Sequence, residues 1–131
     1  MARIVIAEDQ PHIRHVMSLW LRKHGHDVVE ACNGAAALDA LRGVPADLLI
    51  TDVNMPEMDG IELTRCAFGA CATLRRVFVV TSRCDQADIL LQLCDPRVSV
   101  LPKPFSPSQL LREVESAAAL AASAPPPGEL P

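Results

Sequence analysis

The sequence predicts an α/β fold built on one parallel sheet. Short runs of β-branched and other apolar residues recur along the chain, for example at Arg3–Ala7 and Val77–Val80. Segments with apolar residues at helical spacing lie between these runs, and the connections are short. This alternation is typical of a doubly wound sheet with helices on both faces. With 131 residues, half of them hydrophobic, the chain is long enough for one domain with its own core.

The first part of the chain contains three of the expected strands and two of the expected helices. The strands are Arg3–Ala7, a modest one around Val28-Val29, and the apolar run from Leu48 that ends at Asp52. The first helix covers His12–His24, with Pro11 in its first turn and Gly25 closing it. The second helix covers Ala35–Leu41, and Asn33-Gly34 caps it.

The remaining elements follow the same alternation. A helix is expected from about Asp59 into residues 66–70, then a strand at Val77–Val80 that stops at Thr81-Ser82. Asp85 should start the next helix, and Val98–Leu101 should form the fifth strand. Ser106 and Gln109 have capping-box spacing, which predicts a last helix from Leu110 to about Ala122.

Five strands and five helices in this order fit few topologies, because parallel crossovers are right-handed. We expect the flavodoxin-like strand order 2-1-3-4-5. Half of a dinucleotide-binding fold would need a G-x-G-x-x-G turn after the first strand, where this chain has Glu8-Asp9-Gln10-Pro11. We expect residues 1–120 to form the domain and the Pro-rich residues 121–131 to form a mobile tail.

Composition excludes several classes of function. The formal net charge of −4 and the pI near 5.5 argue against nucleic acid as the main partner. The chain has no secretory signal and no apolar run long enough to cross a membrane, so a cytoplasmic protein is expected. The cysteines Cys66, Cys71 and Cys84 are expected to be buried small hydrophobes, and the basic residues of the first helix to form a solvated face.

Polar residues follow four of the five predicted strands. Glu8 and Asp9 follow the first strand, Asp52 the third, Thr81 the fourth and Lys103 the fifth. Ligands bind beyond the carboxyl ends of such strands, where the strand order reverses. Because neighbouring strands are about 4.8 Å apart, these side chains should surround one small volume, into which the long Lys103 side chain reaches.

Three neighbouring carboxylates repel one another unless protons or a cation neutralise them, and a divalent cation is the better answer. Oxygen ligands without His or Cys favour Mg2+. Mg2+ and Lys103 together would form a site for a tetrahedral dianion, with Thr81 donating a hydrogen bond to it. A phosphoryl group arriving there would be attacked by Asp52, which would become an aspartyl phosphate.

These residues resemble the receiver domain of bacterial two-component response regulators, including the single-domain, chemotaxis-like type. The resemblance spans residues 3 to about 120 and rests on four motifs: Ile-Val-Ile-Ala-Glu-Asp ending at Asp9, Asp52-Val-Asn-Met-Pro-Glu-Met-Asp-Gly60, Thr81-Ser82 and Lys103-Pro-Phe105. It implies a phosphorylation-dependent switch rather than an enzyme with an external substrate.

The resemblance also implies partners and ligands. Asp52 would receive phosphate from a sensor histidine kinase or a histidine phosphotransferase, and the output would be contact with a downstream protein. Asp9, Asp52 and the backbone carbonyl of Asn54 would bind Mg2+, with Glu8 acting through water. The Lys103-Pro104 peptide bond would be cis, which would aim Lys103 inward.

Two departures from the family pattern keep an alternative open. Val100 stands where receivers commonly carry an aromatic residue, and Ser82 replaces the usual alanine. Both are compatible with a scaffold that binds partners without being phosphorylated. A phosphatase with an aspartate nucleophile is a further alternative, but its usual pattern has a second aspartate where this chain has Asn54.

Overall fold

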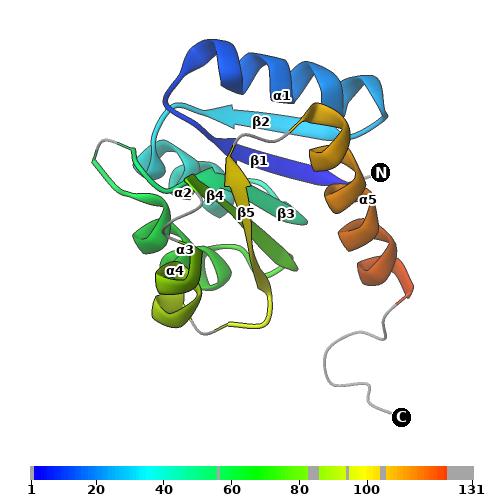
Figure 1. The fold of residues 1–131 in the computed structure, drawn as a ribbon. Coiled ribbons are helices and arrows are strands. Elements are labelled where there is room, and N and C mark those ends of the chain that lie inside the picture. The colour runs from blue at the N-terminus through cyan, green and yellow to red at the C-terminus, as the bar shows by residue number, and fades with distance from the viewer. Residues whose placement is uncertain (1, 56, 83–85, 94, 104–105, 124–131) are drawn as a thin grey trace.

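The structure is a computed structural model, and it describes residues 2–55, 57–82, 86–93, 95–103 and 106–123. In this part of the chain, strands and helices alternate from the first element to the last (Figure 1). The strands are β1 (Arg3–Ala7), β2 (Asp27–Ala31), β3 (Leu48–Asp52), β4 (Arg76–Ser82) and β5 (Val98–Lys103). The helices are α1 (Pro11–Lys23), α2 (Gly34–Gly43), α3 (Gly60–Ala70), α4 (Gln86–Leu93) and α5 (Pro107–Ser123).

The strands form one parallel sheet in the order β2-β1-β3-β4-β5, which confirms the predicted topology. The strand order reverses between β1 and β3. The strand that follows β1 in the chain, β2, lies on one side of this pair, and the strand that follows β3, β4, lies on the other side. Ala7 at the end of β1 is in register with Thr51, the residue before Asp52. The register therefore places the residues after β1 beside the end of β3.

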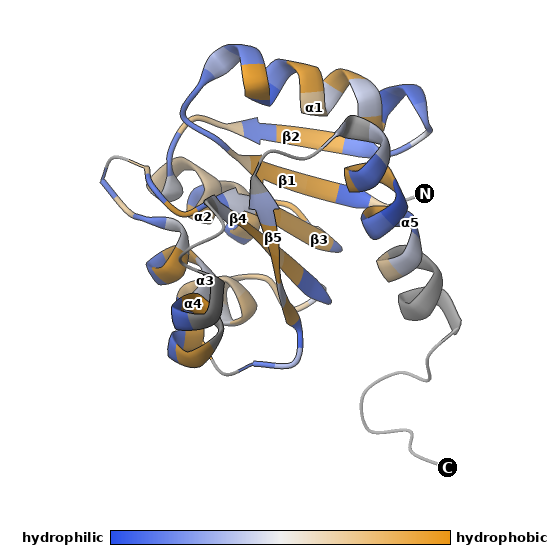
Figure 2. Cartoon of the chain, in the orientation of Figure 1, coloured by the Kyte–Doolittle hydropathy of each residue, from blue (hydrophilic) through white to orange (hydrophobic). Residues whose placement is uncertain are grey.

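The helices cover both faces of the sheet, α1 and α5 on one and α2, α3 and α4 on the other (Figure 1). Successive strand residues alternate between two buried clusters, as expected for a sheet with helices on both sides. In β1, Ile4 and Ile6 pack toward α1 and α5, while Val5 and Ala7 pack toward α2 and α3. Figure 2 shows mainly hydrophobic strands at the centre, with hydrophilic segments on the surrounding helices and connections.

The helix ends agree with the capping signals. The Asn33 side chain accepts the Ala36 amide at 2.7 Å, and the Ser106 hydroxyl accepts the Gln109 amide at 3.1 Å. Gly25 follows α1 with a φ of 89°, a conformation that side-chain-bearing residues rarely adopt. Capping therefore fixes where α2 and α5 start, and glycine allows the turn after α1.

The last two strands are longer than expected. β4 includes Thr81 and Ser82, and β5 includes Pro102 and Lys103. Pro102 pairs in register with Thr81, and a proline is tolerated there because β5 is an edge strand. The backbones of Thr81, Ser82 and Lys103 thus belong to the sheet rather than to a loop.

α5 is tied to the start of the chain through a buried histidine. The Ala2 amide donates to His26 Nδ1 at 3.1 Å, and His26 Nε2 lies 3.7 Å from a Glu115 carboxylate oxygen. Burial lowers the pKa of His26, while Glu115 opposes this shift. α5 itself runs to Ser123, and residues 124–131 lie outside the described part, so the predicted tail stays a prediction.

None of the helices in the described part of the chain combines the length and apolar character that crossing a bilayer requires.

Candidate functional site

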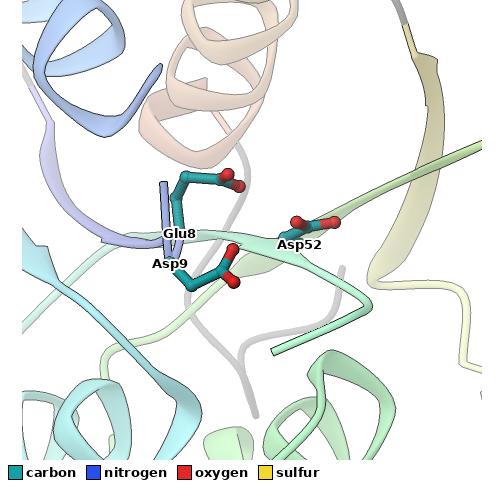
Figure 3. Close-up of side chains that lie close together, drawn as sticks. All are labelled: Glu8, Asp9 and Asp52. Atoms are coloured by element: carbon teal, nitrogen blue, oxygen red, sulfur yellow. The ribbon is translucent and has the colours of Figure 1, made fainter. Parts of the chain in front are cut away.

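Three carboxylates meet where β1 and β3 end (Figure 3). Glu8 and Asp9 directly follow β1, and Asp52 is the last residue of β3. One ligand atom from each carboxylate lies within 4.8 Å of the other two. Glu8 and Asp52 are 4% and 8% exposed, whereas Asp9 is exposed to solvent. The predicted convergence of these acids is therefore present, at the boundary between core and solvent.

The backbone around Asp52 fixes its carboxylate. The Val53 amide donates to Asp52 Oδ1 at 2.8 Å, and the Gly60 amide donates to the Val53 carbonyl at 2.9 Å. A Cβ atom on Gly60 would lie 2.9 Å from the Asp52 carbonyl carbon, so only glycine allows α3 to start this close to the strand. The Asp59 side chain caps α3 by accepting the Glu62 amide at 2.8 Å.

Arg14 holds the other side of the cluster, a role that the sequence did not predict. Its Nη1 donates to the Glu8 carbonyl oxygen at 2.7 Å, and its Nε lies 3.5 Å from a Glu30 carboxylate oxygen. The expectation of a solvated basic face is therefore wrong for Arg14, whose side chain is only 18% exposed. The missed signal is its place in the first turns of α1, from where a long side chain reaches back to the end of β1.

Thr81 lies one residue beyond Val80, the register partner of Asp52 on the neighbouring strand. It is 2% exposed, and its hydroxyl has no hydrogen-bond partner among the described residues. A buried hydroxyl normally has a partner, so this one has the capacity to bind a ligand atom. A small cavity adjoins the cluster, lined by Ala7, Glu8, Ile13, Met17, Ile50, Asp52 and Val80.

Two parts of the expected site are described incompletely. The backbone of Lys103 belongs to β5 and pairs with Ser82, but its side chain lies outside the described part. Pro104 is also outside it, so the cis peptide bond stays a prediction. Asn54 is exposed in the loop that joins β3 to α3.

The chemistry of the acidic cluster fits Mg2+. All three side chains offer oxygen ligands, which Mg2+ prefers, and three like charges this close together require a cation or protons. Among the described residues, this is the only group of three or more His, Cys, Asp or Glu side chains close enough to hold a metal ion.

Of the three cysteines expected to be buried, the structure describes Cys66 and Cys71. Cys71 is buried as expected, with its thiol 3.5 Å from the Ala46 carbonyl oxygen. Cys66 is exposed, so the expectation of burial is wrong for it. The buried positions of α3 are Gly60, Leu63, Thr64 and Ala67, and residue 66 lies outside the stripe of the helix that they form. Cys84 lies outside the described residues.

Comparison with known proteins agrees with this geometry. Residues 4–115 match the model of the response regulator receiver domain family. The response regulator receiver protein CpdR of Brucella abortus is 40% identical over 118 residues, which are 88% of this chain and 95% of that protein.

Two solved structures show the same fold. The receiver domain of the hybrid histidine kinase CckA is 32% identical, with a TM-score of 0.74 over 88% of this chain and 97% of that one. The chemotaxis protein CheY4 of Vibrio cholerae is 26% identical, with a TM-score of 0.78 over 89% of this chain and 98% of that one.

Proposed function

Because this chain belongs to the response regulator receiver domain family of bacterial two-component signalling, we propose that it is a phosphoacceptor switch with Asp52 as the acceptor. The observation that carries the proposal is the convergence of Glu8 and Asp9 on Asp52 within 4.8 Å. The donor would be a phosphohistidine on a sensor histidine kinase or a histidine phosphotransferase.

In the proposed reaction, a carboxylate oxygen of Asp52 forms a bond to phosphorus while the bond from phosphorus to the histidine nitrogen breaks. The electron pair of that bond leaves with the imidazole, which takes up a proton. The Val53 amide, 2.8 Å from Asp52 Oδ1, restricts rotation of the carboxylate and so orients it for attack. A preorganised nucleophile of this kind needs little rearrangement at the moment of reaction.

The ligands of Mg2+ would be Asp9, Asp52 and the Asn54 carbonyl, with Glu8 acting through water. When bound, Mg2+ offsets the negative charge of the carboxylates and of the phosphoryl oxygens. The Thr81 hydroxyl would donate a hydrogen bond to another phosphoryl oxygen. Thr81 is buried, and it directly follows Val80, the register partner of Asp52. Lys103 would pair with a third phosphoryl oxygen.

The output of the switch would be contact with a downstream protein. Thr81 and Val100 lie on neighbouring strands, and Val100 is half-buried against the cluster that includes Ile89 of α4. Val100 has no ring to swing between a buried and an exposed position. We therefore expect phosphorylation to alter the surroundings of Thr81 more than the outer surfaces of α4 and α5.

The test is phosphorylation by acetyl phosphate in the presence of Mg2+, followed by intact mass spectrometry. Wild type should gain one phosphoryl group, and Asp52→Asn should gain none. Asp39→Asn is the matched control, because this aspartate on α2 is exposed, pairs with Arg42 and does not belong to the acidic cluster. Labelling of Asp52→Asn would disprove the assignment of Asp52 as the acceptor. If wild type is not labelled but still binds a partner protein without Mg2+, an unphosphorylated scaffold would be favoured.

A further inference from the structure

The start of α2 lies against the loop that joins β3 to α3. Gly34 is the first residue of α2, is buried, and has no side chain to separate the helix from the loop. A Cβ atom there would overlap the Met58 carbonyl oxygen, and it would lie 2.8 Å from Met58 Cβ and 2.9 Å from the Met58 carbonyl carbon. These are backbone and Cβ atoms, which cannot rotate away as the end of a long side chain does. A side chain at position 34 would therefore move the loop.

The loop has little freedom to absorb such a movement near Met58. Its beginning is tied to its end by the hydrogen bond from the Gly60 amide to the Val53 carbonyl, 2.9 Å long. Glu57, directly before Met58, has a φ of 69°, a left-handed conformation that costs energy for a residue with a side chain. Because the two ends of the loop are tied together, a displacement of Met58 would also strain its start, where Asn54 follows Val53.

We propose that Gly34 is a positioning residue for the phosphoacceptor site, because the space left by its missing side chain determines where the Asn54 carbonyl lies relative to Asp52. This inference rests on the proposed function, in which that carbonyl binds Mg2+. Gly34 acts through the Met58 backbone and touches neither the metal ligands nor the phosphoryl group. Its substitution should weaken Mg2+ binding while every side chain of the acidic cluster stays in place.

The experiment compares Gly34→Ala with Gly69→Ala in the full chain. A Cβ atom on Gly69 of α3 meets nothing within 4 Å, so this variant controls for replacing a helical glycine with alanine. Mg2+ affinity is measured by calorimetric titration, and the phosphorylation rate is measured with acetyl phosphate. We expect Gly34→Ala to bind Mg2+ about tenfold or more weakly than wild type, as is common when the support of a metal ligand is disturbed. Gly69→Ala should bind like wild type.

Helix propensity by itself favours alanine over glycine at both positions. A purely helical effect would therefore leave Mg2+ binding unchanged in both variants, and equal Mg2+ affinities of the two variants would overturn the inference. If wild type itself binds no Mg2+ and accepts no phosphate, the proposed function fails. That result differs from a failure of the inference about Gly34, in which wild type binds Mg2+ and Gly34→Ala binds it equally well.

A second pair of variants keeps the test informative if Gly34→Ala does not fold. Replacing Met58 with glycine removes the Cβ atom at 2.8 Å and lets the backbone move at lower cost, while the Met58 carbonyl oxygen remains and still displaces the loop. The double variant Gly34→Ala/Met58→Gly should fold and should bind Mg2+ more weakly than Met58→Gly alone. Equal affinities, or a double variant that remains unfolded although the loop can now move, would overturn the inference that position 34 acts by displacing the loop.

Discussion

Removing one charge from the acidic cluster should have opposite effects on stability with and without Mg2+. At 4.8 Å, two like unit charges repel by about 0.9 kcal/mol at the dielectric constant of water. Asp9 faces two such neighbours, Glu8 and Asp52. Asp9→Asn should therefore raise the free energy of unfolding by roughly 1 to 2 kcal/mol in EDTA, which is a rise in melting temperature of about 4 °C or more.

Mg2+ should reverse the order of stability of wild type and Asp9→Asn. At a concentration 100 times its dissociation constant, a ligand stabilises the folded state by about 2.7 kcal/mol. Asp9→Asn removes a proposed ligand and should lose most of this gain, so wild type becomes the more stable protein in Mg2+.

The assay is urea denaturation of both proteins in EDTA and in saturating Mg2+. Asp39→Asn, which makes the same change in net charge on the exposed surface of α2, is the control and should keep the full response to Mg2+. The reasoning would be refuted if Asp9→Asn were less stable than wild type in EDTA, or if Mg2+ stabilised both proteins equally.

Three further predictions concern the support of the fold and the site. Because burial lowers the pKa of His26, the unfolded chain binds the proton more tightly than the folded protein does. The stability contributed by His26 should therefore be constant above about pH 6.5 and should fall as the pH drops below it. Denaturation measured across pH should show a smaller fall in a His26→Gln variant. Gly60→Ala would force a side chain against the Asp52 carbonyl and should cost about 1 to 3 kcal/mol in thermal unfolding, together with a slower phosphorylation. Asn33→Ala removes the cap that accepts the Ala36 amide and should cost about 1 kcal/mol with no change in Mg2+ affinity; an altered affinity would mean that the cap also supports the site.

The sequence by itself determined the order of the elements, the sheet topology and the meeting of Glu8, Asp9 and Asp52. These follow from local information: β-branched runs that end in acids, caps such as Asn33, and the rule that parallel strands share one edge for their carboxyl ends. The register of Ala7 with Thr51 then leaves the residues after β1 no place except beside Asp52.

Only the tertiary structure decided which side chains support that cluster from other elements. Arg14 and Cys66 each occupy a helix position whose environment depends on how the helix is rotated against the sheet, and the sequence pattern misplaced both. The close approach of Gly34 to the Met58 carbonyl is likewise invisible in the sequence, where a glycine after Asn33 is explained by capping alone. Short-range signals specify backbone conformation, whereas the space around an atom depends on chain segments that meet only when the whole domain has packed.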